Sequence, residues 1–296
     1  MIHTFTSPYT SGTLLHRMPE LPEVERGRKI AEGAALGKRV IACEVDENDD
    51  IVFDGVDPLA VAELLKGARV TAVRRHGKQL WFELDRRPFV LFHFGMTGAF
   101  VVPNVAPLVL ESTPKKQDLS WPPRFSKIRM TFDDGAELAM VNKRRLGRIR
   151  LRDHPEEESP IRELGFDPYL ELPKLADFRA LLARRSVTLK GLLLDQSFAA
   201  GVGNWIADEV LYQAKLDPRR KVDALSAAEQ KALHGALKKV VHKAVAVEAD
   251  KTRFPKNWLF HRRWGKDKDA VTVAGDAIVH ATIAGRTTAW VPAVQK

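Results

Sequence analysis

Two adjacent residues near the start of the chain have types that could carry out covalent chemistry together. Pro19 follows Met18 directly, and Glu20 follows Pro19. A proline at a free N-terminus is a secondary amine with a pKa of about 7.7–8.0, so a useful fraction is neutral and nucleophilic at pH 7. Its attack on an electrophilic carbon leaves an iminium Schiff base, and a neighbouring carboxylate can move the protons. Proline inside a peptide bond is a tertiary amide and cannot react in this way.

Residues 1–18 therefore decide whether this chemistry is available. They contain no acidic residue and several serines and threonines. This composition fits a mitochondrial-type transit peptide, a disordered extension, or an upstream start that the mature protein does not use. We expect an active form that starts at Met18 and then loses this methionine, so residues 1–18 form an extension that is absent or removed.

The charge of the chain favours a polyanionic partner. The net charge is +9, from 47 basic and 38 acidic side chains. Residues 124–152 hold nine basic and three acidic side chains, and residues 251–268 hold seven basic side chains and one acidic side chain. A uniformly solvated protein has no need for such clusters, whereas binding to nucleic-acid phosphates uses them.

The cysteine count and the hydropathy pattern exclude several classes. The single cysteine, Cys43, rules out an internal disulfide framework and a zinc site built from several thiolates. No apolar stretch approaches the roughly 18 residues of a membrane span. We therefore expect no metal, no cofactor and no membrane partner.

The apolar pattern predicts the elements that must position these residues. A proline in the opening turn and early acidic residues predict a helix over 22–32. Short alternating runs with Asp-Gly turns follow and predict an antiparallel β-sandwich. An acidic connector over 153–167 is typical of a solvated linker. Helical spacing returns in the next part of the chain, and a β-hairpin is predicted around Ala284-Gly285. The runs that carry these predictions are strands at 40–45, 80–84, 89–94, 128–132 and 137–141, helices at 175–183, 189–195, 204–214 and 227–245, and hairpin strands at 277–283 and 287–291.

Six motifs in one order connect the chain to a known family. Together they resemble the formamidopyrimidine-DNA glycosylase family, which repairs DNA by base excision, and the resemblance covers about residues 18–292. The motifs are Pro19–Glu25 (PELPEVE), Arg74–Leu80 (RRHGKQL), His93–Gly98 (HFGMTG), Asn142–Gly147 (NKRRLG), Leu194–Gln196 (LDQ) and Gly201–Glu209 (GVGNWIADE).

The resemblance implies an α+β fold with four parts after the extension. These are a catalytic β-sandwich domain with an N-terminal helix over 19–152, an acidic linker over 153–170, an all-α helix–two-turn–helix domain over 171–253, and a β-hairpin finger with a C-terminal tail over 254–296. Many family members hold zinc in the finger with four cysteines. Because no cysteine follows Cys43 here, the finger resembles the zincless finger of plant and fungal members. Packing around four aromatic side chains is expected to replace the metal: Trp258, Phe260, Trp264 and Trp290.

The resemblance also implies catalytic roles. Pro19 corresponds to the family nucleophile, which attacks the sugar C1′ and forms a Schiff base, followed by β,δ-elimination. Glu20 corresponds to the acid that moves protons to the leaving base and the sugar ring oxygen. Lys78 corresponds to a phosphate contact that also aids proton transfer, and Glu23 to an acid that organises the pocket.

Further residues match the family's DNA contacts. His93, Lys190, Asn204 and Arg286 are expected to bind the phosphates near the lesion. Extrusion of a nucleotide leaves a hole in the duplex, which inserted side chains fill. The residues expected to fill this hole and contact the orphaned base are Met96, Arg144 and Leu146. The family has phenylalanine where Leu146 stands, so the opposite-base preference is left open.

The sequence thus predicts a bifunctional DNA glycosylase and abasic-site lyase that acts as a monomer on double-stranded DNA with oxidised bases or abasic sites. By resemblance, formamidopyrimidines and hydantoins are the preferred candidates, ahead of 8-oxoguanine, because residues 247–258 are short for the loop that caps this base in bacterial relatives. The alternatives are an oxidised-pyrimidine glycosylase of the endonuclease-eight type and, if the extension is retained, a catalytically silent protein that binds damaged DNA. We expect a nuclear location, or a mitochondrial one through residues 1–17.

Overall fold

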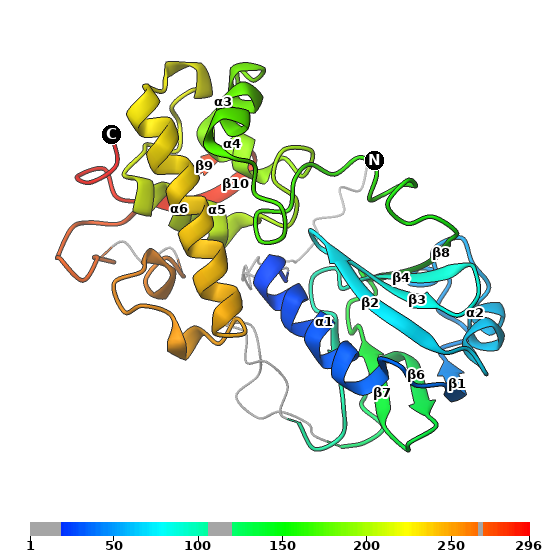
Figure 1. The fold of residues 1–296 in the computed structure, drawn as a ribbon. Coiled ribbons are helices and arrows are strands. Elements are labelled where there is room, and N and C mark those ends of the chain that lie inside the picture. Colours follow the sequence, from blue (N-terminus) through cyan, green and yellow to red (C-terminus); the bar gives the residue numbers. More distant parts are fainter. Residues whose placement is uncertain (1–18, 106–119, 266–268) are drawn as a thin grey trace, which may run out of the picture.

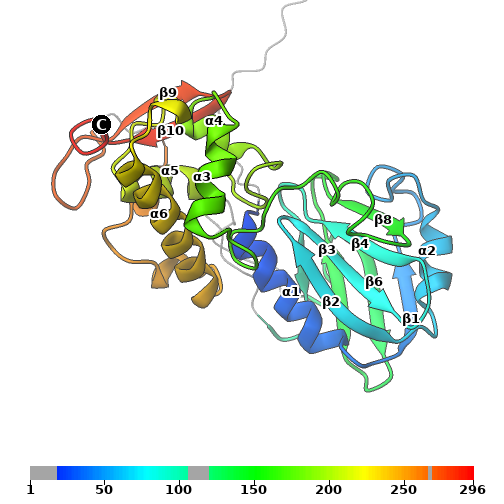
Figure 2. The ribbon, with the colours of Figure 1, turned by 45° about the horizontal axis from the view of Figure 1, so that its top comes forward.

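The computed structural model describes residues 19–105, 120–265 and 269–296, which form two lobes (Figure 1). The N-terminal lobe is built from β-sheets and the C-terminal lobe from helices and a hairpin. Helix α1 (Leu21–Ala35) contacts β2 and β5 of the first lobe and α6 of the second. Turning the molecule shows the same helix along the sheets, on the side that faces the second lobe (Figure 2). The N-terminal end of the described chain therefore lies between the lobes.

The N-terminal lobe is a sandwich of two antiparallel four-stranded sheets, as predicted. The first sheet has the order β1-β6-β7-β5 and the second the order β2-β3-β4-β8. A short helix, α2, begins with a proline after the Asp57 cap and follows β1. The bounds are β1 Val40–Val45, α2 Pro58–Leu65, β2 Val70–His76, β3 Gln79–Leu84, β4 Phe89–His93, β5 Ala99–Val101, β6 Ser126–Phe132, β7 Glu137–Val141 and β8 Arg148–Arg152.

The core of the sandwich is aromatic at its centre. Phe82, Phe92 and Phe100 come from three strands, and their ring centroids lie 5.0–5.7 Å apart. Val24 and Ala31 on the inner face of α1 join the same core. Burial of this apolar face, rather than helix propensity alone, fixes α1 on the sandwich.

The C-terminal lobe packs four helices around a second core, and the mixed α+β class is confirmed. Ser226 caps α6 with a capping box to Glu229, and Lys215 ends α5 in the left-handed conformation. The bounds are α3 Leu175–Ala183, α4 Leu189–Leu194, α5 Asn204–Ala214, α6 Ala227–Ala246, and the 3-10 turns η1 Val222–Ala224, η2 Lys251–Arg253 and η3 Leu259–His261.

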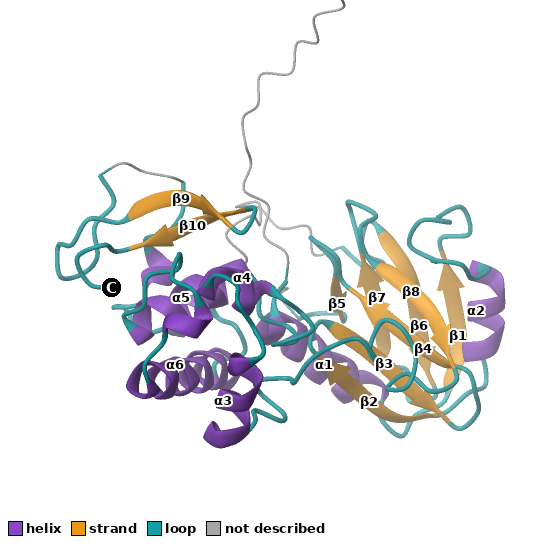
Figure 3. Cartoon of the chain, turned by 90° about the horizontal axis from the view of Figure 1, so that it is seen from above, coloured by secondary structure: helices purple, strands orange, loops and turns teal. Residues whose placement is uncertain are grey.

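The chain ends in an antiparallel hairpin of β9 (Val279–Ile283) and β10 (Arg286–Trp290). Ala284 and Gly285 both have positive φ, the conformation of a two-residue type I′ turn. Figure 3 shows the hairpin lying across α4 and α5. The turn is where the sequence predicts it, and the strand bounds differ by one or two residues.

The connector between the lobes differs from the solvated linker that its charge suggests. Its first part, up to residue 164, forms largely exposed turns in which Pro155 and Ile161 are buried, and Asp167 is fully buried. The Asp167 carboxylate pairs with the guanidinium of Arg75 and accepts the backbone N–H of Gly77 at 2.8 Å. Because buried Arg75 needs a counter-charge, this end of the connector is drawn into the protein.

Candidate active site and nucleic-acid interface

Glu20 joins the two lobes through its carboxylate. Pro19 and Glu20 are both buried and directly precede α1. The Glu20 oxygens accept the backbone N–H groups of Gly203 at 2.9 Å, Trp205 at 2.8 Å and Ile206 at 3.1 Å. These amides begin α5, and the free N–H groups of a helix start are the natural partners of an anion. The residue after the predicted nucleophile is thereby held at one orientation.

The surroundings of Glu20 adjust its acidity in two directions. Burial raises the pKa of this carboxyl, while the charge of Lys78 and the α5 amides oppose the rise. A raised pKa increases the fraction of Glu20 that carries a proton near neutral pH, which suits a group that must both give and take one. Gly203 leaves no spare room, since an added Cβ would lie 2.3 Å from Glu20 Cδ.

Lys78 lies in the two-residue turn between β2 and β3, beside the same loop of the other lobe. Its Nζ donates to the carbonyl oxygen of Val202 at 3.2 Å. Burial lowers the pKa of Lys78, Glu20 and Glu23 oppose this effect, and Arg286 adds to it. These couplings show that four of the predicted site residues, from α1, the β2–β3 turn and the hairpin, act on one another electrostatically.

Glu23 lies in the first turn of α1. Its Oε2 accepts the backbone N–H of Glu20 at 3.0 Å. It therefore fixes the backbone that carries the Glu20 side chain, which agrees with an organising role and places its contact at the helix start.

The predicted void-filling residues lie on two adjoining loops. Met96 is in the turn between β4 and β5, and exposed Arg144 and Leu146 are in the turn between β7 and β8. Buried Asn142 holds both turns: its Nδ2 donates to Phe94 O at 2.8 Å, and its Oδ1 accepts the N–H of Leu146 at 2.9 Å. Leu146 is 39% exposed, a large apolar side chain left in contact with solvent. The structure thus brings these three residues to one edge of the sandwich.

His93 ends β4, in register with Gln79 on one side and Arg148 on the other. Its Nδ1 accepts the N–H of Gly95 at 3.2 Å. Burial, with a further contribution from Lys78, lowers the pKa of His93 to about 4. The imidazole is therefore neutral at physiological pH, and any contact it makes with a phosphate is a neutral hydrogen bond.

Lys190 and Asn204 lie differently from the exposed phosphate contacts that the sequence suggests. Lys190 is fully buried, with its Nζ paired to Asp208 and donating to Asn204 O at 2.9 Å. The Asn204 Nδ2 donates to Thr287 O of β10 at 2.8 Å. Their roles in DNA binding stay predictions, because in the unbound chain both side chains bind protein groups.

Arg286 is exposed at the start of β10, immediately after the hairpin turn. Among the described residues, no hydrogen bond or ion pair occupies its guanidinium. It is available to bind an external anion such as a phosphate.

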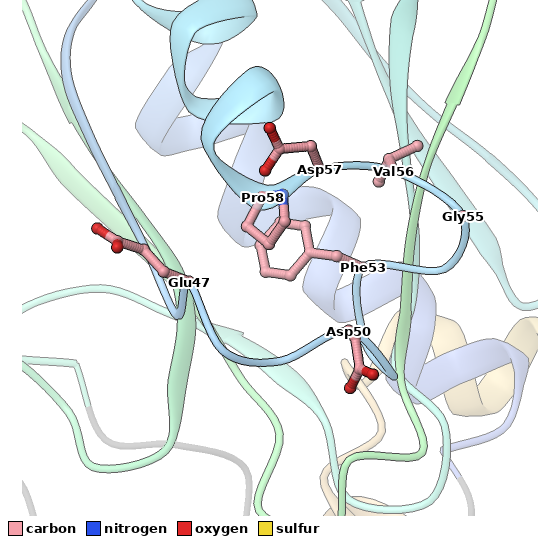
Figure 4. A pocket seen from close by; sticks show the side chains of 7 residues that line it. All are labelled: Glu47, Asp50, Phe53, Gly55, Val56, Asp57 and Pro58. Atoms are coloured by element: carbon pink, nitrogen blue, oxygen red, sulfur yellow. The ribbon is translucent and has the colours of Figure 1, made fainter.

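Three further observations concern the rest of the described chain. An open pocket of about 370 Å³ at the start of α2 is lined by Phe53, Pro58 and acidic side chains, and none of its lining residues belongs to the predicted site (Figure 4). In the part of the chain that the structure describes, no three His, Cys, Asp or Glu residues form a group that could hold a metal ion. Within the same residues, no helix is long and apolar enough to span a membrane.

Sequence reasoning missed Asn142 and Asp208 as residues that support the site. Each is a polar residue inside one of the six motifs and directly follows an apolar residue, Val141 or Ala207. Asp208 also follows Asn204 by four residues, which places both on one face of α5. That spacing was the available signal.

The chain matches known proteins over almost all of its described length. Residues 18–149 match the formamidopyrimidine-DNA glycosylase N-terminal domain, and residues 164–256 match the helix–two-turn–helix domain of the same enzymes. A formamidopyrimidine-DNA glycosylase of Arabidopsis thaliana is 43% identical over 279 residues, covering 94% of this chain and 71% of that protein. One from Listeria monocytogenes is 29% identical, covering 94% and 100%.

Solved structures show the same fold. The Lactococcus lactis enzyme bound to DNA with an abasic site has a TM-score of 0.75 at 24% identity, covering 94% of this chain and 99% of that one. The same enzyme in complex with DNA containing a formamidopyrimidine has a TM-score of 0.74 at 23% identity. Together with the plant relative and the two domain matches, this shows that the chain belongs to the formamidopyrimidine-DNA glycosylase family.

Proposed function

We propose that this chain is a DNA glycosylase and abasic-site lyase that removes oxidised purines from double-stranded DNA through the free amine of Pro19. One observation carries the proposal. A buried carboxylate of raised pKa, Glu20, stands next to Pro19 and is coupled to Lys78. The names of the relatives, which are glycosylases of formamidopyrimidine, supply the substrate class.

The chemistry follows from these groups. The nitrogen lone pair of Pro19 forms a bond to C1′, and the bond from C1′ to the base breaks, with its electron pair leaving on the base. Glu20 gives its proton to the leaving base, takes up the proton that the Pro19 nitrogen loses, and passes it to the ring oxygen, which opens the sugar and leaves an iminium ion. Loss of a C2′ proton then expels the 3′ phosphate, and a second elimination expels the 5′ phosphate. Each step needs Pro19 as an amine and not as an amide.

The start of the family match supports the shorter chain. The N-terminal domain match begins at residue 18, the methionine before Pro19. Removal of Met18 from a chain that begins there frees the Pro19 nitrogen. The extension then belongs to a precursor or to an unused start. We propose a nuclear location for the shorter chain, and a mitochondrial one for any precursor that carries residues 1–17.

Strand cleavage by the shorter chain tests the proposal against oxidised-pyrimidine repair. Duplexes with one formamidopyrimidine or one thymine glycol are incubated with the enzyme, and the nicked products are measured. We expect faster cleavage at formamidopyrimidine. Faster cleavage at thymine glycol would establish the endonuclease-eight type instead, and intact strands with tight binding would identify a silent damage-binding protein.

A further inference from the structure

Among the residues that the structure describes, no strand covers the second edge of β10. It pairs with β9 on one side only, and the two strands form a separate two-stranded sheet. Because Arg286 pairs with Ile283 directly at the turn, the backbone groups of residues 286, 288 and 290 face β9. The backbone groups of Thr287 and Ala289 face the other way. Isolated two-stranded hairpins are marginally stable in water, so this edge needs support.

Helix α5 supplies the missing partners from two side chains. Asn204 Nδ2 donates to Thr287 O at 2.8 Å, and Asp208 Oδ2 accepts the N–H of Ala289 at 3.0 Å. Four residues along a helix rise about 6 Å and two residues along a strand span about 6.7 Å, so the two repeats match. One face of α5 therefore takes the place of a third strand.

Asp208 does more than satisfy one amide. It is 1% exposed and pairs with the buried Lys190 ammonium of α4 and with the guanidinium of Arg263, which follows η3. Arg263 Nε also donates to Asp208 Oδ2 at 3.1 Å, and the Arg263 carbonyl oxygen lies 3.1 Å from His280 Nε2 on β9. The Asp208 carboxylate thus links α5 directly to α4, to the segment after η3 and to β10, and it is connected to β9 through Arg263.

Three of the four aromatic side chains that were predicted to pack in the finger pack together beside this centre. Trp258 and Phe260 are buried in the helical core, and Trp264 packs against it. Trp290 lies elsewhere, with the Arg219 guanidinium 4.4 Å from its ring centroid. Apolar packing has no direction and cannot by itself fix strand register. The charged centre adds hydrogen bonds with defined directions.

We propose that Asp208 is the positioning residue of the finger, which fixes the free edge of β10 on α5 and thereby places Arg286. Asp208 does not touch DNA in this account. The claim that Asp208 affects DNA binding by placing Arg286 rests on the proposed function. The claim that Asp208 fixes β10 on α5 does not.

Amide hydrogen exchange of the unaltered chain tests the β10 contact directly. We expect the Ala289 N–H to be protected like the amides that pair β10 with β9, since a charged acceptor holds it. Exchange of Ala289 as fast as that of the turn residues Ala284 and Gly285 would overturn the proposal. This measurement needs no variant and no DNA.

Asp208→Asn tests the positioning role, with Asp177→Asn as the matched control. Asp177 is exposed on α3, and its replacement changes the net charge equally. For Asp208→Asn we expect the exchange rate of the Ala289 amide and the Kd for an abasic-site duplex each to rise about tenfold. A tenfold change is the expected effect of losing one charge-assisted hydrogen bond. Borohydride trapping at saturating DNA stays within about threefold, because among the described residues Asp208 makes no hydrogen bond or ion pair with Pro19 or Glu20.

The outcomes separate the claims. If Ala289 exchange is unchanged in folded Asp208→Asn, the claim that Asp208 fixes β10 on α5 is wrong. If Ala289 exchanges faster but the Kd is unchanged, the claim that Asp208 positions Arg286 is wrong. An equal rise of Kd in Asp177→Asn also overturns it, since net charge then explains the effect. If the unaltered shorter chain itself traps no DNA, the proposed function fails. The exchange of Ala289 still tests whether Asp208 fixes β10 on α5.

Discussion

At the scale of single residues, Glu20 has two tasks that are normally separate. Its carboxylate holds the first turn of α5 through three backbone amides and stands beside the predicted nucleophile. A group bound by three donors keeps its orientation, which is the requirement for proton transfer within a fixed geometry. The contacts between the lobes and the chemistry therefore depend on the same side chain.

Glu20→Gln separates the two tasks. We expect the rate of base removal, measured in single turnover on a formamidopyrimidine duplex, to fall by about 10²–10⁴-fold, because the amide cannot move a proton. The Kd for an abasic-site duplex should change far less. A variant that retains base removal at the rate of the unaltered chain would exclude Glu20 as the proton carrier.

Gly203→Ala tests the fit of Glu20 against α5. The added Cβ would lie 2.3 Å from Glu20 Cδ, so either the carboxylate or the helix must move. We expect a loss of about 1–3 kcal/mol in the free energy of unfolding and a loss of activity.

Gly235→Ala is the control for this change. Gly235 is inside α6, where an added Cβ meets nothing within 4 Å. The same substitution there should stabilise the chain by roughly 0.5–1 kcal/mol and leave activity unchanged. Equal effects at the two positions, measured by denaturant unfolding, would contradict the tight fit at Gly203.

At the scale of elements, the sequence predicts the main helices and seven of the ten described strands, but it leaves out β2, β5 and β8 and predicts the buried polar contacts poorly. Helix α5 has the predicted bounds, 204–214, because apolar periodicity follows from which face is buried. The inward position of Lys190 and the bond from Asn204 to β10 could not be predicted. They depend on where distant Asp208 and Thr287 come to lie, and local pattern carries no information about that.

For the catalytic residues Glu20 and Lys78, too, the sequence predicts the residue types but not their contacts. The motifs identify Glu20 and Lys78 as residue types suited to the chemistry. Their coupling arises only when the β2–β3 turn meets the loop before α5. The family resemblance, not the spacing, placed them together in advance. The hydrogen bonds by which Asn142 holds the two void-filling loops together likewise could not be predicted from the sequence.

Glu209 predicts a pH dependence for the C-terminal lobe. Its carboxyl is buried, accepts the N–H of Phe260 at 2.8 Å, and has a pKa raised by burial from 4.5 to about 7. Between these values the folded chain holds more protons than the unfolded one. This contribution to stability is therefore full below pH 4.5 and is lost as the pH rises through 7, by up to about 3 kcal/mol.

Comparison with Glu209→Gln isolates this contribution. Denaturant unfolding at pH 5 and pH 8 should show a smaller decrease of the free energy of unfolding in the variant than in the unaltered chain. Glu63→Gln, at an exposed position on α2, is the control. Identical pH dependence in the Glu209 variant and the unaltered chain would contradict a titration of Glu209 in this range.

At the scale of the whole molecule, the uneven charge predicts binding dominated by phosphates. The exposed guanidinium of Arg286 and the basic residues of the turn that carries Arg144 are placed on different lobes. Each phosphate neutralised adds about −0.9 to the slope of the logarithm of the association constant against the logarithm of salt concentration.

Arg286→Ala should reduce the magnitude of this slope by about 1. The control is Arg162→Ala, which removes the same charge from an exposed turn of the connector. Fluorescence anisotropy over a range of salt concentrations measures both slopes. Equal slopes in the two variants would mean that Arg286 makes no phosphate contact and that only net charge acts.

The most direct test of the account concerns the nitrogen of Pro19. The chain that begins at Pro19 and the chain that begins at Met1, both verified by mass spectrometry, are each mixed with an abasic-site duplex and borohydride. We predict a covalent protein–DNA complex for the chain that begins at Pro19 and none for the longer chain, because only the former has a free secondary amine. Equal trapping of the longer chain, with residues 1–18 intact, would contradict Pro19 as the nucleophile.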